Sequence, residues 1–444
     1  MTILELTSGT LQQTTLNKVG DGCHYDELYL STGTYTAAIP YKLNSGTTIT
    51  GPGDRSAIIT LAPGLSTGLF PAMTPVFGQA TDTISDIVLE NLTIWGNWDL
   101  QTVYHGKGFH NILGLNNCSG VTVRNITAGD NKGDIARITD STDITFSGNT
   151  VLGCGHDGLY IERCKDVEAW NNTIKVRINS GLRSKGSGNV SFHDNDIVST
   201  SEYTPRTGPL IQVENSKANE TTSDVMISNN YLANSQGPGI WAAGHTATDL
   251  NAAKGLIIKN NLIVGCGQMP TDVMVSSVGG GILVDGWNDV LVENNTLDGC
   301  YGAGIRFAPY LLTSVNSGYT AVVRKNIITN TRKNPAGKGG EAVFNGGKYV
   351  IESSENCYYG NVFENYSNVK STSDILANPL FEDPGTNYHL KEDSPCRLSG
   401  GQLGCYTDDF KHPVTPAYLS FECSEGELNE IKKIYPERKI MRKL

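Results

Sequence analysis

Three consecutive segments between residues 133 and 197 share one pattern, and each begins 23 residues after the one before it. They read GDIARITDSTDITFSGNTV, HDGLYIERCKDVEAWNNTI and NSGLRSKGSGNVSFHDNDI. In each, a short apolar strand, a bend and a second strand lead to an asparagine and a third apolar piece. A repeat this short cannot bury its own apolar face, whereas stacked neighbours bury a continuous core. The Gly, Asn, Asp and Ser bends therefore predict a coil of β-strands rather than helices.

The second-strand pattern recurs along most of the chain, from DIVLENLTI at 86–94 to TAVVRKNII at 320–328. In its last seven copies an asparagine falls six residues after the strand start, at Asn149, Asn172, Asn195, Asn230, Asn261, Asn295 and Asn326. Identical asparagines at one bend of successive coils can hydrogen-bond amide to amide and satisfy buried turn groups. The spacing thus predicts an asparagine ladder with a structural role.

This order of strands and bends resembles the right-handed parallel β-helix of pectate lyases, polygalacturonases and phage tailspikes. The resemblance covers roughly residues 10–350. It implies an all-β solenoid whose first sheet, built from IARIT, GLYIE and GLRSK, holds the substrate. The texture of the chain and the segment NPLFEDPGTNYHLKEDSPCRLSGG also resemble disaggregatase-related β-helix proteins of methanogenic archaea, which act on a glucuronate- and galactosamine-containing polysaccharide.

We expect three regions along the chain. A β-helix with an N-terminal cap occupies residues 1–350, and a short helix at 10–22 closes its open end. An irregular closing segment follows over 351–420. The tail over 421–444 is basic with spaced apolar residues, a pattern that favours a terminal helix or a solvated cap.

The intervals between ladder asparagines predict where the long loops lie. After Asn195 the interval grows from 23 to 35, 31, 34 and 31 residues, yet the six-residue interval from the strand start to each asparagine stays constant. The extra residues therefore flank the first sheet, at 95–109, 198–207, 215–223, 243–254, 267–279, 308–319 and 330–340. Loops on both sides of one face build a groove, and loops carry function more often than scaffolds do.

The amino-acid composition argues against some classes of binding partner. A formal net charge of −11 argues against nucleic acid or anionic membranes as partners, since both require a positive surface. No apolar run is long enough to span a membrane. The start MTILELTSGT lacks the features of a signal peptide, so a secreted or cell-surface protein would begin after its cleavage site. Several N-x-S/T sequons add weak support for export, at Asn91, Asn125, Asn189, Asn219 and Asn365.

The ten cysteines include no CxxC motif, which argues against zinc-ribbon and thioredoxin-like sites. Cys266 and Cys300 should stack on adjacent coils, either as a disulfide or as two thiols. Cys396 and Cys405 could close a small loop near the end of the chain.

Strand alternation places chemistry-bearing side chains on the outward face of the first sheet. One column holds Arg137, Tyr160 and Arg183, with Gln212, Trp241 and Arg306 as continuations. A second holds Thr139, Glu162 and Lys185, with Glu214 and Asp285 as extensions. At the strand entrance a third column holds Asn111, Asp134, Asp157 and Ser180, with His156 beside Asp157.

Each column also has a purely structural interpretation. The charged columns could be a solvated surface with ion pairs between coils. Asp134 and Asp157 could cap backbone amides at their bends, and His156 could bridge a turn.

Two chemistries suit these residues. In a hydrolase, Asp134 and Asp157 supply the acid and the base or nucleophile, His156 and Glu162 support them, and no cofactor is required. HDGLYI and Arg183-Ser-Lys185 are similar to the strand-entrance motif and the Arg-x-Lys clamp of polygalacturonases, although the paired aspartates and the Gly-His-Gly motif of that family are absent. In a lyase or C5-epimerase, Lys185, Arg183, Tyr160 or His156 would transfer the proton, and a cation such as Ca²⁺ would neutralise the uronate.

A tailspike-like or adhesin-like protein that binds glycan without cutting it is the third class, and a homotrimer would suit it. We expect hydrolysis of an acidic polysaccharide. Arg137, Arg183, Lys185 and Arg306 would hold uronate groups, Tyr160 and Trp241 would stack on sugar rings, and Asp285 would add a polar contact.

Overall fold

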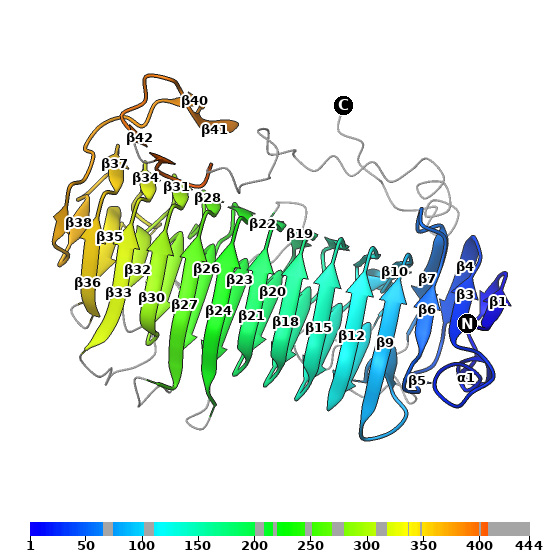
Figure 1. Cartoon of the computed structure of the whole chain (residues 1–444). Helices are drawn as coiled ribbons and strands as arrows, with labels where there is room; N and C mark the ends of the chain where they lie inside the picture. Colours follow the sequence, from blue (N-terminus) through cyan, green and yellow to red (C-terminus); the bar gives the residue numbers. More distant parts are fainter. Residues whose placement is uncertain are drawn as a thin grey trace.

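The computed structural model describes residues 1–64, 74–101, 111–199, 208–215, 220–244, 251–268, 279–307, 318–335, 337–346, 349–398 and 401–406. Over these residues the chain winds as a right-handed parallel β-helix with almost no helical structure (Figure 1). Three long parallel sheets form its sides. Each coil contributes one strand to each sheet, so strands three apart in sequence are hydrogen-bonded neighbours through most of the solenoid.

The sheet that carries the predicted site has 12 strands among the described residues. In spatial order they are β5 (Tyr41–Leu43), β8 (Phe77–Gln79), β11 (Leu113–Asn116), β14 (Ala136–Thr139), β17 (Leu159–Glu162), β20 (Leu182–Lys185), β23 (Ile211–Asn215), β26 (Ile240–Gly244), β29 (Ile282–Asp285), β32 (Ala303–Phe307), β35 (Glu341–Asn345) and β38 (Tyr366–Ser367). This 12-stranded sheet is the predicted first sheet.

The second strands of the repeat form a sheet of 14 described strands. They are β1 (Ile3–Leu6), β3 (Glu27–Leu30), β6 (Thr48–Thr50), β9 (Ile84–Glu90), β12 (Cys118–Arg124), β15 (Thr142–Ser147), β18 (Lys165–Trp170), β21 (Gly188–His193), β24 (Thr222–Ser228), β27 (Ala253–Lys259), β30 (Asn288–Glu293), β33 (Tyr319–Arg324), β36 (Tyr349–Ser354) and β39 (Ser371–Thr372).

The third strands form a sheet of 13 described strands. They are β2 (Gly9–Thr10), β4 (Gly33–Ala37), β7 (Ala57–Leu61), β10 (Thr93–Trp95), β13 (Thr127–Gly129), β16 (Thr150–Leu152), β19 (Thr173–Val176), β22 (Asp196–Ser199), β25 (Tyr231–Ala233), β28 (Leu262–Val264), β31 (Thr296–Asp298), β34 (Ile327–Thr329) and β37 (Cys357–Tyr359). Two antiparallel pairs complete the strands, β40 (Phe381–Asp383) with β41 (Asn387–Leu390) and β42 (Arg397–Leu398) with β43 (Gly401–Gln402).

The core is a stack of identical positions. Inward residues of each strand, such as Leu159, Ile161 and Val167, are almost completely buried and pack against their equivalents one coil away. Each coil therefore buries an apolar face that it could not bury alone, as the repeat requires.

Ladder asparagines lie at the bend between the 14-stranded and 13-stranded sheets. Each side-chain amide from Asn172 to Asn326 donates to the Oδ1 of the next asparagine at 2.8–3.0 Å. Each Oδ1 also accepts the backbone N–H of the preceding asparagine as far as Asn356, whose own N–H donates to Asp374 Oδ1. The stack thus satisfies buried groups that would otherwise cost ~1–3 kcal/mol each.

Three expectations differ from the structure. The N-terminal helix is only α1 (Gln13–Leu16), a single turn whose N-cap residue makes no side-chain capping bond. Parallel coils continue beyond residue 350 through β36, β37, β38 and β39, so the closing segment begins later than expected. The described cysteines, Cys266, Cys300, Cys396 and Cys405 among them, are all free thiols, so the first pair is a thiol stack and the second does not close a loop.

Other expectations lie outside the described residues. Most of the predicted groove loops and the whole tail over 421–444 belong to this group. No helix within the described ranges is long and apolar enough to cross a membrane.

Candidate functional site

The entrance to the 12-stranded sheet carries the predicted polar column. The backbone N–H of Asp134 donates to Asn111 Oδ1 at 2.9 Å, that of Asp157 to Asp134 Oδ1 at 2.8 Å, and that of Ser180 to Asp157 Oδ1 at 2.8 Å. All four residues are buried. One oxygen of each aspartate therefore caps a backbone amide of the next coil, as the structural interpretation expected.

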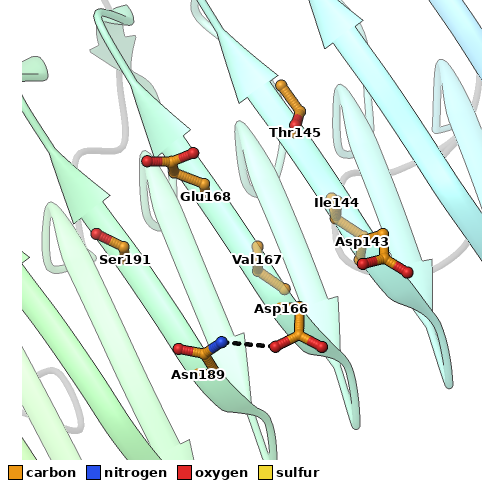
Figure 2. A pocket seen from close by; sticks show the side chains of 8 residues that line it. All are labelled: Asp143, Ile144, Thr145, Asp166, Val167, Glu168, Asn189 and Ser191. Atoms are coloured by element: carbon orange, nitrogen blue, oxygen red, sulfur yellow. Dashed lines mark hydrogen bonds between the residues drawn. The ribbon is translucent and has the colours of Figure 1, made fainter.

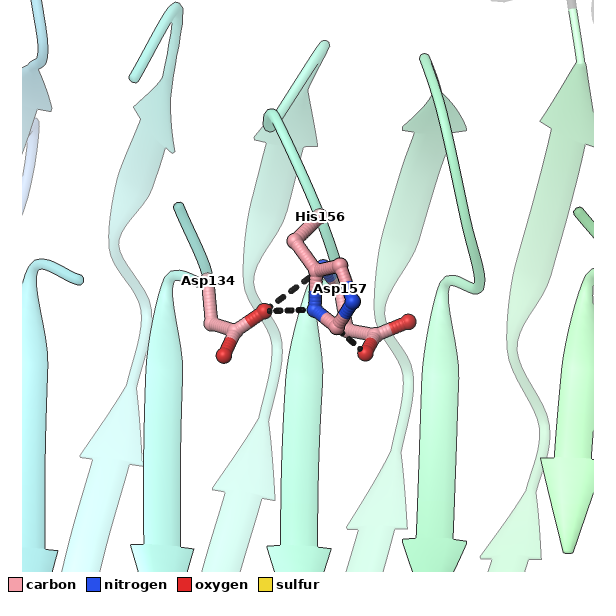
Figure 3. A group of neighbouring side chains, drawn as sticks. All are labelled: Asp134, His156 and Asp157. Carbon is pink, nitrogen blue, oxygen red and sulfur yellow. Dashed lines mark hydrogen bonds and ion pairs between the residues drawn. The ribbon is translucent and has the colours of Figure 1, made fainter. Parts of the chain in front are cut away.

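His156 joins the two aspartates (Figure 3). Its Nδ1 lies 2.7 Å from Asp134 Oδ1 and 2.9 Å from Asp157 Oδ2. Both carboxylates are fully buried, whereas the imidazole is 21% exposed. A turn that happened to contain a histidine would not need two buried counter-charges, so we treat Asp134, His156 and Asp157 as one group, the Asp–His–Asp cluster.

The cluster is charged at neutral pH. Burial alone would lower the pKa of His156, but the charges of Asp157 and Asp134 outweigh burial and raise this pKa to about 10. For Asp157, burial would raise the pKa, while the imidazolium of His156 and the guanidinium of Arg183 bring it below its ordinary value. The imidazole is thus the group that holds a proton, and Asp157 is an ionised carboxylate.

Two arginines from neighbouring strands enclose Tyr160. Arg137, Tyr160 and Arg183 are direct register partners on β14, β17 and β20. The guanidinium carbons of Arg137 and Arg183 lie 4.1 and 5.1 Å from the centre of the tyrosine ring. The phenol is only 3% exposed, so the expectation that its ring offers a free stacking face is wrong in this arrangement.

The same arginines tie the outward face to the Asp–His–Asp cluster. Arg137 Nη1 lies 3.2 Å from Asp134 Oδ2, and Arg183 Nη1 lies 3.6 Å from Asp157 Oδ2. Arg183 Nη2 also pairs with Glu214 Oε1 at 2.6 Å, across the register between β20 and β23. Arg137 and Arg183 are therefore held by carboxylates of the protein itself.

Glu162, in the neighbouring column, contacts several polar side chains. It accepts the Tyr160 hydroxyl at 2.9 Å, and Lys185 Nζ lies 3.4 Å from its other oxygen. Burial would raise the pKa of Glu162, but the Tyr160 hydrogen bond and the charges of Lys185 and Arg163 lower it overall. Glu162 is therefore ionised at neutral pH.

Three predicted residues lie farther along the same sheet. Trp241 on β26, Asp285 on β29 and Arg306 on β32 continue the columns in the register expected. Trp241 is only 7% exposed and packs with Leu283, so its ring is not an open platform either. Asp285 is completely buried. None of the three reaches the Asp–His–Asp cluster, because several strands separate them.

Several residues of the site were missed from the sequence. Asn179 donates its amide to Asp157 Oδ1 at 2.9 Å. Near this edge, Lys132 Nζ and Arg177 Cζ both lie against the ring of Trp98, at 4.1 and 4.0 Å from its centre. Lys132 and Asn179 occupy the bends just before Asp134 and Ser180, so the 23-residue spacing could have placed them beside the column.

The Asp–His–Asp cluster also has the donors of a metal site. One ligand atom from each residue lies within 4.8 Å of the others. Two carboxylates and an imidazole suit a transition metal better than Ca²⁺, which prefers oxygen ligands only. The nearby guanidinium groups of Arg137 and Arg183 oppose a further divalent charge. The arrangement therefore fits a proton better than a metal between the two carboxylates.

A separate depression lies on the 14-stranded sheet and contains none of the predicted residues (Figure 2). Its lining comes from β15, β18 and β21 and consists of Asp143, Ile144, Thr145, Asp166, Val167, Glu168, Asn189 and Ser191. Asn189 Nδ2 donates to Asp166 Oδ1 at 2.5 Å. Its side chains are mostly solvated and belong to a different face from the Asp–His–Asp cluster.

Two family models match the chain in adjoining stretches. Residues 85–222 match the right-handed β-helix region, and residues 222–404 match a family described as disaggregatase related. No curated protein sequence matches the chain.

Solved structures with a similar fold have low sequence identity. The A-module of mannuronan C-5 epimerase AlgE6 from Azotobacter vinelandii is 13% identical, covers 80% of this chain and 91% of its own length, and superposes with a TM-score of 0.55. The surface adhesin PfbA of Streptococcus pneumoniae is 14% identical over 86% of this chain and 94% of its own, with a TM-score of 0.49. A family 28 exopolygalacturonase of Yersinia enterocolitica is 11% identical over 82% of this chain and 74% of its own, with a TM-score of 0.49.

The 23-residue coils, the three parallel sheets and the family match agree with one another. The chain is a right-handed parallel β-helix protein, and its residues 222–404 are similar to the disaggregatase-related family.

Proposed function

We propose that this chain is a secreted or cell-surface carbohydrate-active enzyme that hydrolyses glycosidic bonds of an acidic polysaccharide on the outward face of its 12-stranded sheet. The observation that carries this proposal is the convergence of Asp134 and Asp157 on one imidazole. Glycoside hydrolysis needs a proton donor and a carboxylate on the same side of the scaffold. The Asp–His–Asp cluster supplies both at one edge of the sheet.

The residues take distinct roles in this proposal. Asp157, whose pKa is lowered by His156 and Arg183 against the effect of burial, is the base or nucleophile. His156 holds the mobile proton and is the partly exposed member of the cluster, so it passes that proton toward the leaving oxygen, directly or through Asp134. Asp134 and Asp157 place oxygens 2.7 and 2.9 Å from the same imidazole nitrogen, and two carboxylates this close favour the retaining arrangement over the wider inverting one.

The charge balance of the face favours an acidic substrate over a cationic one. Five cationic groups meet five carboxylates there, so the face is balanced within a chain of formal net charge −11. The cations are Arg137, His156, Arg163, Arg183 and Lys185, and the carboxylates are Asp134, Asp140, Asp157, Glu162 and Glu214. A balanced face is locally more positive than the rest of an acidic chain, which favours a uronate over a cationic ligand.

Proton abstraction by a lyase or C5-epimerase is less well supported. Burial raises the pKa of Tyr160 against the opposing charge of Arg183, so its phenolate is inaccessible at neutral pH. The guanidinium of Arg183 stays charged because the charges of Asp157 and Glu214 overcome burial and raise its pKa. With His156 also protonated, three of the four candidate bases hold their protons.

Glycan binding without cleavage is the second candidate function. It is favoured by the complete burial of Asp134 and Asp157 and by the backbone amides that each of them caps. A binding protein would keep this network as scaffold and use only the exposed parts of the cations.

The test follows new reducing ends and absorbance near 235 nm on a panel of uronic-acid polysaccharides. Reducing ends without absorbance are expected, and Asp134→Asn and Asp157→Asn should abolish them. A rise of absorbance in step would replace hydrolysis by β-elimination. Retained binding without either signal would establish the binding protein instead.

Asp166→Asn provides a matched control for these variants. It makes the same isosteric change in the depression of the 14-stranded sheet, away from the cluster. Loss of activity in this control as well would mean that global damage, and not the chemistry of the cluster, explains the result.

A further inference from the structure

Two oppositely charged residues, Arg306 and Glu341, lie at the far end of the 12-stranded sheet from the Asp–His–Asp cluster. Glu341 is the direct register partner of Ala303 at the start of β35, two residues before Val343. Register partners followed from strand to strand place this position in the same column as Asp134 and Asp157. By the same route Arg306 occupies the position of Arg137 and Arg183. The sequence did not reveal Glu341, because the unequal coil lengths after Asn195 hide the register.

Each residue of this pair has a buried polar atom without a hydrogen-bond partner. Within the part of the chain that the structure describes, these atoms are Arg306 Nε and Glu341 Oε2. Glu341 is 8% exposed and acts on Arg306 electrostatically, but the two side chains form no ion pair among the described residues. The guanidinium instead lies 4.3 Å from the centre of the Phe344 ring. A buried donor and a buried acceptor without partners on paired strands each carry a desolvation cost that a ligand could relieve.

The missing partner has a definite chemistry. It must present an anion or acceptor to Arg306 and a hydroxyl donor to Glu341, next to an aromatic ring. A sugar acid offers all three features, with its carboxylate, its hydroxyl groups and its apolar ring face. A simple anion would satisfy Arg306 but would be repelled by Glu341.

We propose that Arg306, Glu341 and Phe344 form a second subsite that binds one sugar-acid residue of the same polysaccharide, remote from the Asp–His–Asp cluster. This inference rests on the proposed function and adds to it a requirement for substrate length. Four strand spacings separate Arg183 on β20 from Arg306 on β32, which is ~19 Å at ~4.8 Å per strand. Trp241 and Leu283 form an apolar floor between the two polar sites. Only an oligosaccharide long enough to cross that apolar floor can bind both sites at once and so gain affinity.

The test measures binding of oligouronides, from dimers to dodecamers, to the whole chain by calorimetry. Wild-type protein should bind short oligomers weakly and gain affinity once the oligomer spans both sites. Arg306→Gln should remove about 10- to 100-fold of that gain, the value of a lost charge-assisted bond, and leave the affinity for short oligomers unchanged. Arg306→Lys keeps the charge and serves if the glutamine variant does not fold.

Arg324→Gln is the matched control, because it removes the same charge from an exposed residue that pairs with Glu293 on the 14-stranded sheet. Length-dependent affinity that survives Arg306→Gln would overturn the second subsite and leave the proposed function standing. Wild-type protein that binds no oligouronide of any length would remove the proposed function itself.

Discussion

Replacement of His156 by glutamine tests the electrostatic reasoning most directly. The substitution leaves Asp134 and Asp157, both completely buried, without the imidazolium that lies 2.7 and 2.9 Å from their oxygens. Removing one partner of a buried charge pair costs ~3–5 kcal/mol, because an uncompensated charge remains. The remaining charges of Arg137 and Arg183 place our expectation near the lower end, at ~3 kcal/mol at neutral pH.

The pH dependence of this loss has a definite sign. The pKa of His156 is raised from 6.5 in the unfolded chain to about 10 in the fold. Its stabilising contribution is therefore complete below pH ~6.5 and disappears as pH rises through about 10. The difference in unfolding free energy between wild type and His156→Gln should have its full size at pH ~6.5 and should shrink as pH rises toward about 10.

Hydrogen exchange at two backbone amides next to the Asp–His–Asp cluster measures the local loss of stability in His156→Gln. The N–H groups of Asp157 and Ser180 donate to the two carboxylates, so their protection should fall by about 100-fold in the variant at pH 7. Peptide-resolved exchange suits a solenoid better than one global unfolding midpoint, since long repeat arrays need not unfold in one step.

His193→Gln is the internal control. His193 is 22% exposed and also contacts two carboxylates, Glu168 and Asp194, but these are 52% and 22% exposed. Solvated pairs are worth ~0–1 kcal/mol, so this variant should exchange almost like wild type. Equal effects of the two substitutions, or unchanged protection in His156→Gln, would refute the claim that burial makes the Asp–His–Asp cluster strong.

Two further substitutions test the scaffold. Asn172→Ala removes an amide that donates to Phe146 O and Asn195 Oδ1 and an oxygen that accepts from the Asn149 N–H, so we expect a loss of ~2–3 kcal/mol, measured by urea unfolding. Gly155→Ala would bring a Cβ within 2.5 Å of the Lys132 backbone. This clash should lower the free energy of unfolding by ~1–3 kcal/mol and displace the adjoining His156. As a control, the Cβ of Gly53→Ala meets nothing within 4 Å, so this substitution should leave stability unchanged.

Much of the fold was predictable because the repeat fixes it. The constant 23-residue spacing determines both the register of β14, β17 and β20 and the alignment of the Asn149–Asn195 ladder. Irregular ends carry no such constraint. Asn356 was missed because the spacing pattern fades after Asn326. The N-terminal helix was overestimated because edge strands β1 and β2 take up the chain before α1, which is a single short turn.

The columns of outward side chains in the site were predictable from the sequence, but the contacts between those side chains were not. Alternation determines that Arg137, Tyr160 and Arg183 point outward, and the structure agrees. Alternation cannot say that both guanidinium groups close over the phenol, because that depends on side-chain conformation and on the carboxylates nearby. The bend residue His156 lies outside any strand, so no periodicity determines the direction of its ring.

The column at the sheet entrance shows which property of Asp134 and Asp157 is needed for the fold and which is not. Asn111 accepts the N–H of Asp134 in the way that Asp134 accepts the N–H of Asp157, so a neutral amide performs the capping role. Capping therefore explains an oxygen at this position but not a negative charge. The charge is needed only if something cationic or a proton must be held there, and His156 lies against both aspartates. Asparagine at position 134 would keep the capping oxygen and remove the charge, so activity lost from a chain that remains folded would assign that charge to the chemistry of the site.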